Sequence, residues 1–216
     1  MARRSKARSA KTATAARSSG TPRDRILDAA LALAEREGWR NASLRAIAQE
    51  AGVSLHEFYS EFRSRAAILG ALMARTDGVV LAGTTIAGED ESQRDRLFDV
   101  LMRRFDAMKP HRAALKAIAR GLGTDPPTAL CSAPAFLRSM AWMLEAAGLS
   151  SAGIRGRLHV RALGVLYLCV MRVFVDDDTE DLAKTMAALD RRLSQAEPWL
   201  GLGRFRWGPR EQKQSA

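Results

Sequence analysis

Residues 52–62 are GVSLHEFYSEF, and this stretch decides the fold that we expect. Gly52 is suited to ending a helix, because glycine adopts a left-handed conformation without steric cost. Ser54 follows two residues later and is suited to capping the next helix. Ser43 opens the preceding short helix in the same way. Two short helices joined by a glycine-containing turn predict a helix-turn-helix motif.

The second helix of this motif carries two acids, Glu57 and Glu61. DNA carries one negative charge for about every 1.7 Å of its axis, so it repels carboxylates. Ser54 and Glu57 fit an S-x-x-E capping box, which makes Glu57 structural. The alternative is that Glu57 accepts a hydrogen bond from cytosine, and both roles are compatible. Glu61 has Arg65 four residues later, which predicts an exposed helical ion pair; the alternative is that Glu61 disfavours DNA binding.

A first helix precedes the motif and completes a head domain over residues 21–65. Thr21 is a candidate cap, and Pro22 suits the first helical position. Gly38 is expected to end this helix in a left-handed conformation, and Trp39 is expected to close over the core.

Helical periodicity continues beyond the head and predicts a second domain over residues 66–200. The expected helices are 64–81, 94–108, 111–122, 126–148, 162–175 and 179–196, with a loop at 83–93. The apolar stretch 162–175 is too short to span a bilayer, which needs about 20 residues. We therefore expect an all-α protein without an integral membrane segment, in which a three-helix head precedes a C-terminal bundle of about six helices.

The net charge of +10 is concentrated near the N-terminus. Residues 1–23 hold seven bases and no acid, residues 24–65 hold six bases and seven acids, and residues 66–216 hold 21 bases and 17 acids. We expect residues 1–20 to be a disordered basic arm that lies along DNA phosphates or in a minor groove. Its Arg- and Ser-rich composition is also that of a mitochondrial transit peptide. Residues 201–216 are expected to be a flexible basic tail.

No enzyme signature is present in the sequence. It has no GxSxG, P-loop or GxGxxG motif. Cys131 and Cys169 are isolated, and the three histidines lack metal-binding spacing. We expect no catalytic residue, metal or cofactor, and we expect two buried thiols in a reducing cytosol.

The region around the helix-turn-helix resembles the TetR family of transcriptional regulators. The matching residues are Ile26-Leu27-Asp28-Ala29-Ala30, Gly38-Trp39, Ser43-Leu44-Arg45, Ile47-Ala48, Ala51-Gly52-Val53-Ser54, Tyr59 and Phe62. The resemblance implies a cytoplasmic bacterial homodimer whose two recognition helices enter successive major grooves of a palindromic operator in double-stranded DNA. It also implies a C-terminal domain that dimerises through its last two long helices and encloses an apolar effector pocket. Ligand binding then changes the spacing of the heads and releases DNA, as in a repressor.

The candidate DNA-binding residues lie on and beside the predicted recognition helix. The resemblance implies that the Tyr59 hydroxyl reaches phosphate, while the neighbouring serines and His56 face the groove and the arginines suit phosphate contacts. The candidates are Arg45, Ser54, Leu55, His56, Glu57, Tyr59, Ser60, Arg63 and Arg65. The sequence departs from the family pattern at His56 and Glu57, where a small or polar residue is usual, and at Glu61, where an aromatic residue or histidine is usual.

A stripe of methionine, phenylalanine and leucine in the second domain is a candidate pocket wall for an apolar small molecule or a lipid. Its members are Met102, Phe105, Phe136, Met140, Met143 and Leu166. The alternative is that they form ordinary core. The leucine stripe from Leu182 to Leu193 fits either a dimer four-helix bundle or packing within one subunit.

The C-terminal half supports a second functional hypothesis. FDVLMRRFDAM, RVFVDDD and KTMAALDRRL resemble a branch of this fold that includes the mitochondrial lipid-binding protein of ubiquinone biosynthesis. That resemblance implies a lipid-binding protein of isoprenoid or quinone metabolism that does not bind DNA.

Overall fold

The computed structural model of the chain describes residues 20–84 and 92–200, and these residues form helices without a strand. The head contains α2 (Pro22–Glu37), α3 (Leu44–Ala51) and α4 (Leu55–Glu61). The body contains α5 (Arg65–Ala82), α6 (Gln93–Met108), the 3-10 turn η1 (Lys109–His111), α7 (Arg112–Gly123), α8 (Pro126–Ala146), α9 (Gly153–Phe174) and α10 (Ala183–Leu200). The expected all-α fold is confirmed. The basic arm, most of the 83–93 loop and the basic tail lie outside the described residues.

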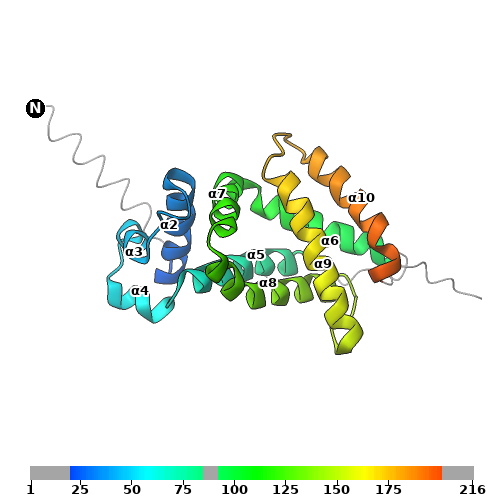
Figure 1. The fold of residues 1–216 in the computed structure, drawn as a ribbon, viewed down its shortest axis with the longest axis horizontal. Helices are drawn as coiled ribbons and strands as arrows, with labels where there is room; N and C mark the ends of the chain where they lie inside the picture. The colour runs from blue at the N-terminus through cyan, green and yellow to red at the C-terminus, as the bar shows by residue number, and fades with distance from the viewer. Residues whose placement is uncertain (1–19, 85–91, 201–216) are drawn as a thin grey trace, which may run out of the picture.

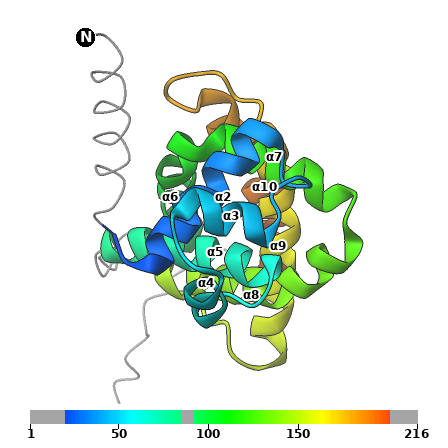
Figure 2. The ribbon, with the colours of Figure 1, turned by 90° about the vertical axis from the view of Figure 1, so that its left-hand side faces the viewer.

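The head and body lie side by side along the long axis of the molecule (Figure 1). The head occupies one end, and α7 of the body packs against α2. Viewed from the head end, α3 and α4 lie in front of the body helices (Figure 2). The three head helices therefore reach solvent at the end of the molecule that is farthest from α9 and α10.

Local capping residues fix where the head helices begin. The Thr21 hydroxyl accepts from the Asp24 amide at 3.2 Å, and the Ser43 hydroxyl accepts from the Ala46 amide at 3.1 Å. Gly52 is left-handed, with φ 64° and ψ 36°, as expected for a helix stop. Gly38 has φ 83° but ψ 148°, so its predicted left-handed helical conformation was wrong. Its positive φ still suits glycine, and Trp39, which follows it, is fully buried.

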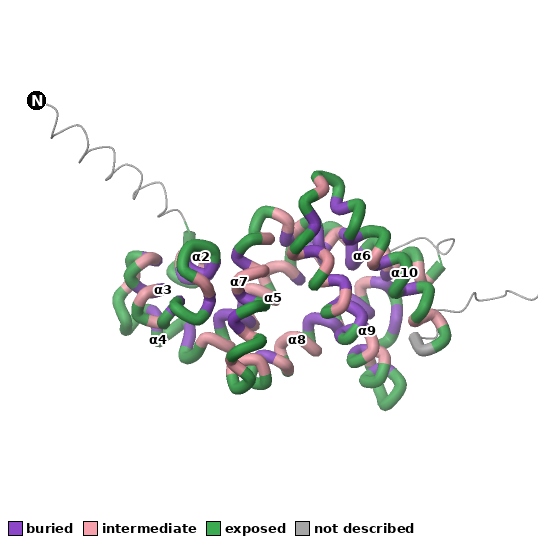
Figure 3. The backbone as a smooth tube through the Cα atoms, turned by 45° about the horizontal axis from the view of Figure 1, so that its top comes forward, coloured by how far each residue is buried: buried purple, intermediate pink, exposed green. Residues whose placement is uncertain are grey.

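A separate core holds the body together, and buried positions follow α6 and α9 (Figure 3). The core contains a polar group: Arg104, which is 2% exposed, is paired with Asp77. The Ser139 hydroxyl also donates to Asp77 at 2.7 Å. Removing one partner of a buried pair leaves an uncompensated charge, so this network ties α5, α6 and α8 into one arrangement.

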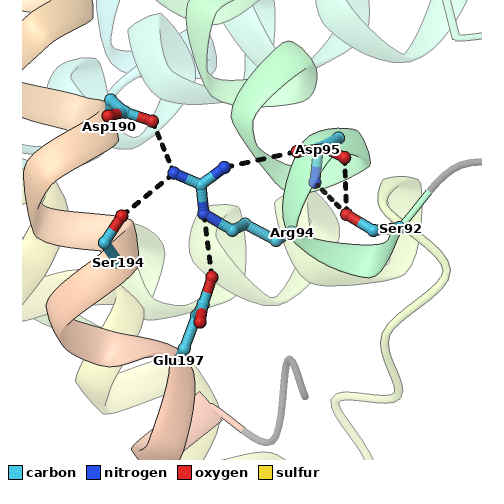
Figure 4. Close-up of polar contacts among 6 residues, drawn as sticks. All are labelled: Ser92, Arg94, Asp95, Asp190, Ser194 and Glu197. Carbon is cyan, nitrogen blue, oxygen red and sulfur yellow. Dashed lines mark hydrogen bonds and ion pairs between the residues drawn. The ribbon is translucent and has the colours of Figure 1, made fainter. Parts of the chain in front are cut away.

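Arg94 of α6 fixes α10 to the rest of the body (Figure 4). Its guanidinium donates to the Ser194 hydroxyl at 3.0 Å, lies 3.0 Å from Glu197 and is paired with Asp190. Leu189 and Leu193 on the inner side of α10, and Leu182 just before the helix, are fully buried in the body core. The leucine stripe therefore packs within one subunit.

Two body helices differ from their expected bounds. α9 begins at Gly153 rather than at 162, because its first turns carry no continuous apolar run that would mark a helix. α10 begins at Ala183 rather than at 179, because the preceding segment forms a turn around Asp177. None of the helices in the described part of the chain is both long and apolar enough to cross a membrane.

Candidate nucleic-acid interface and apolar cavity

The outer edge of α4 is uncovered by the described part of the chain. Leu55 and Tyr59 are each 59% exposed, and His56 and Ser60, which follow them in the chain, are also exposed. On the opposite side of the helix, Phe58 and Phe62 are buried, which anchors α4 to the head core.

Two arginines flank this edge. Arg45 of α3 is exposed, and the exposed Arg63 guanidinium lies 5.3 Å from the centroid of the Tyr59 ring. Among the described residues, no carboxylate is paired with either arginine. Arg63 is therefore placed where it could contact a phosphate beside α4, and Arg45 is exposed on the neighbouring helix.

Glu57 closes a capping box at the start of α4. The Ser54 hydroxyl accepts from the Glu57 amide at 3.1 Å, and the Glu57 carboxylate accepts from the Ser54 amide at 2.8 Å. Hydrogen bonds from the Ser54 amide, and then from its hydroxyl, lower the pKa of Glu57. The capping interpretation is confirmed, while a contact between Glu57 and cytosine stays a prediction.

Glu61 does not pair with Arg65, so that prediction was wrong. Glu61 is the last residue of α4, and the chain then extends at Phe62, so Arg65 is not one helical turn away. The Glu61 carboxylate instead lies 3.5 Å from Arg23 of α2. The Arg23 guanidinium also lies 4.8 Å from the centroid of the Phe62 ring. The negative charge of Glu61 is thus compensated by a cation within the head.

Arg65 points into the junction between head and body rather than along the outer edge of α4. Its guanidinium donates to the Trp39 carbonyl, lies 4.7 Å from the centroid of the Trp39 ring and lies 3.9 Å from the Asp125 carboxylate. Asp125 in turn caps α8 by accepting from the Thr128 amide. Unlike Arg45 and Arg63, Arg65 is placed as a link between the two domains.

Sequence reasoning missed the residue that supports the turn before α4. The Arg25 guanidinium of α2 donates to the carbonyls of Ala51 at 3.4 Å and Gly52 at 3.5 Å. These carbonyls end α3, where a cation is favoured by the helix dipole. No local pattern marks Arg25, since it shares the first turns of α2 with Arg23 and Asp24 and its partners are 26 and 27 residues away in the chain.

A largely apolar cavity of about 680 Å³ lies among the body helices, with one head residue on its wall. Its wall draws on Leu31 of the head, on α5, on α7 and on α9. The described residues that line it include three arginines and His111, and none carries a carboxylate. Burial, and then the neighbouring Arg75, lower the pKa of His111. This volume is within the range of small-molecule sites.

The predicted pocket residues need correction, because only Phe136 lies on the cavity wall. The other five belong to the body core, where their side chains are enclosed on all sides. They are Met102, Phe105, Met140, Met143 and Leu166. The alternative that a Met and Phe stripe forms ordinary core holds for these five. Arg104 and Tyr167 line the cavity and were missed, although a charged or hydroxyl side chain on an apolar helical stripe is a detectable signal.

The described residues form no cluster of three or more His, Cys, Asp or Glu side chains that could hold a metal ion. The two cysteines are free; Cys131 is exposed and Cys169 is half-buried. The expectation that both thiols are buried was therefore wrong, because Cys131 lies on the solvent side of α8.

Comparisons with known proteins agree with this geometry. Residues 26–72 match the model for bacterial regulatory proteins of the tetR family. A TetR transcriptional regulator from Nitrosomonas europaea ATCC 19718 is similar over 82% of this chain and 98% of its own, with 26% identity and a TM-score of 0.64. A TetR transcriptional regulator from Rhodococcus sp. RHA1 shares the fold over 80% of this chain and 96% of its own, with 23% identity and a TM-score of 0.57. No curated protein matches the chain.

The family match covers the segment that builds the exposed edge of α4, and the similarity in structure extends through the body. Head, fold and family match therefore agree: residues 26–72 are a DNA-binding region of the tetR family, and the chain as a whole has the fold of TetR transcriptional regulators.

Proposed function

We propose that this regulator is a ligand-responsive repressor that binds a palindromic operator as a homodimer. The observation that carries the proposal is the outer edge of α4, which is exposed, is anchored from behind by two buried phenylalanines and begins with an intact capping box. A rigid short helix with free polar and aromatic side chains suits insertion into the major groove. Leu55, His56, Tyr59 and Ser60 are the proposed groove-facing residues.

The acids on α4 do not oppose this proposal. Glu57 is engaged at the N-terminus of the helix, and Glu61 is balanced by Arg23. Arg45 and Arg63 are the proposed phosphate contacts. Because the lipid-binding alternative would account for Glu61 as an acid that disfavours DNA binding, the pairing of Glu61 with Arg23 favours the regulator.

The proposed effector site is the cavity among the body helices, which Leu31 of the head also lines. Ile118 and Leu122 of α7 line it, while Gly121 of the same helix contacts Trp39 of the head. A ligand that prefers one arrangement of α7 against the head shifts the population of head positions. Differential affinity of that kind is sufficient to release DNA.

Selection of bound duplexes from a random pool, followed by anisotropy titration, tests the proposal. We expect enrichment of a palindrome and a loss of operator affinity on the order of tenfold in Tyr59→Ala, since a hydrogen bond to a charged phosphate is removed. Trp142→Ala is the matched control, because Trp142 is a similarly exposed aromatic on α8, 51% exposed. Failure to enrich any palindrome contradicts the proposed function.

A further inference from the structure

The Tyr167 hydroxyl is a buried donor on the wall of the cavity with a poor internal acceptor. Tyr167 is 3% exposed and lines the cavity from α9. Its oxygen accepts from Arg104 Nε at 3.1 Å. Its proton is directed at the thioether of Met108, with the two heavy atoms 3.5 Å apart. A thioether is a weak acceptor, so a ligand oxygen would replace it with a gain in hydrogen-bond energy.

The charges around the Tyr167 hydroxyl determine which kind of ligand oxygen can bind there. Arg104 is already paired with Asp77, and Ser139 donates to the same carboxylate. The Arg104–Asp77 pair beside Tyr167 therefore carries no net charge. The cavity wall also holds Arg75, which is paired with Asp28, and the exposed Arg172. A ligand carboxylate at the Tyr167 hydroxyl would lose its hydration beside Arg104, whose charge Asp77 already compensates, and a ligand ammonium would meet Arg104. A neutral carbonyl avoids both costs.

Tyr167 also keeps its proton. Burial raises the pKa of Tyr167, and the positive charge of Arg104 opposes that rise. The neutral phenol is thus the form that faces the cavity. Its ring is held in place by Phe105, whose centroid lies 5.3 Å away, so the donor direction is fixed.

We propose that the cavity binds an apolar molecule carrying a neutral carbonyl group, and that the Tyr167 hydroxyl donates to the carbonyl oxygen. The inference rests on the proposed effector role of the cavity and specifies its ligand class. The hydrocarbon part lies against the α5, α7 and α8 walls, where Leu69, Leu122 and Phe136 are exposed to the cavity. Met108 moves aside as the carbonyl takes its place.

The experiment uses the full chain without DNA and three probes of equal length: 2-undecanone, undecanoate and undecylammonium. Calorimetric titration should give the highest affinity for the ketone. Tyr167→Phe should weaken the ketone roughly three- to tenfold and leave undecylammonium unchanged, because the ammonium accepts no hydrogen bond. Ser150→Ala is the control for ligand binding, since it removes an exposed hydroxyl outside the cavity.

Infrared spectroscopy of carbonyl-labelled ketone supplies a direct measurement of the hydrogen bond. The carbonyl band should lie at lower frequency in the wild-type complex than in the Tyr167→Phe complex. Met108→Leu gives a second test that keeps Arg104 bonded: it removes the competing thioether and should tighten ketone binding relative to undecylammonium.

Three results would overturn the inference: no ketone binding, undecylammonium or undecanoate binding as tightly as the ketone, or a carbonyl band that is the same in both complexes. Duplex binding is measured separately. A ketone that binds through Tyr167 without changing operator affinity supports the ligand class and contradicts ligand-responsive repression.

Discussion

At the scale of single residues, the Ser54 hydroxyl stabilises the first turn of α4 both as an acceptor and as a donor. The hydroxyl accepts from the Glu57 amide and donates to the Glu57 carboxylate. Ser54→Ala should therefore lower the free energy of unfolding by about 0.5–2 kcal/mol. Ser60→Ala is the control, because the Ser60 hydroxyl donates only to the His56 carbonyl within the same helix. Urea denaturation followed by circular dichroism measures both, and equal stability of the two variants would contradict the capping role.

Asp177 stabilises the turn before α10 and should make stability depend on acid pH. Burial raises its pKa, but hydrogen bonds from Thr179 and Thr185 outweigh burial and lower it to about 2. The folded pKa lies below the ordinary value, so the stabilisation is present above about pH 4 and is lost as the pH falls towards 2.

Asp177→Asn should therefore cost about 2 kcal/mol at pH 7 and about half as much at pH 3. The asparagine NH₂ would face the Thr185 amide, which also donates. Asp178→Asn is the control, since Asp178 is exposed and pairs with Lys184 at the surface. Chemical denaturation at the two pH values measures the difference, and a loss that does not depend on pH would refute this role.

Residue-level prediction succeeded where partners are close in sequence. The Ser54–Glu57 pair was predictable because a capping box is a local pattern. The partner of Glu61 was not, because Arg23 is 38 residues away in the chain. The prediction for Arg65 was wrong for the same reason, because its contacts with Trp39 and Asp125 form only when the head packs on the body.

At the scale of elements, α9 carries an apolar face that no other part of the described chain covers. Ile154, Leu158, Val165 and Leu168 are between 52% and 81% exposed and share one helical face. The full length of α9 was not predictable from the sequence, because its first turns contain glycines and arginines and no continuous apolar run. This face is the proposed dimer contact, together with Met186 of α10, which is 42% exposed.

Val165→Glu should convert the dimer to a monomer, since it places a charge in the middle of that apolar face. Analytical ultracentrifugation at micromolar concentration measures the mass. Leu130→Glu is the control: Leu130 is 76% exposed but lies on α8. If Val165→Glu stays dimeric, or if both variants dissociate, the contact lies elsewhere.

At the scale of the whole molecule, the fold class was predictable from composition and helical periodicity, but the cavity wall was not. Met140 and Met143 look like pocket residues in the sequence and are fully buried core, while Thr76 and Leu122, which carry no distinguishing pattern, line the cavity. Which face of a buried helix meets a cavity depends on how all of the helices pack. Helical periodicity distinguishes buried positions from exposed ones, but it does not distinguish core positions from positions on a cavity wall.

The distribution of charge predicts how the regulator depends on salt. Residues 24–65 carry six bases against seven acids, whereas residues 1–20 contain six bases and no acid. Deleting residues 1–20 should therefore weaken duplex binding at low salt more than His56→Ala does, and it should flatten the salt dependence. Anisotropy titration of an operator duplex at several salt concentrations measures both effects. Equal losses in the two variants would contradict this division between general attraction and groove contact.

The contact between Gly121 and Trp39 connects the cavity wall to the head. A Cβ on Gly121 would lie 2.8 Å from the Trp39 Cβ, and Trp39 is fully buried, so neither side has room to move. Gly121→Ala should push the head away from α7. It should cost about 1–3 kcal/mol in stability, as overpacking does. It should also lower operator affinity, although Gly121 lies far from the edge of α4.

Gly123→Ala is the matched control for this junction. Gly123 lies on the same helix, and a Cβ there meets no atom within 4 Å. Operator titration at a temperature where both variants are folded separates the coupling from the loss of stability. Because Ile118 and Leu122 line the cavity on either side of Gly121 in the sequence, a shift of α7 that moves the head should also change ligand affinity. Gly121→Ala protein that binds both operator and ligand as wild type does would show that α7 does not link the two sites.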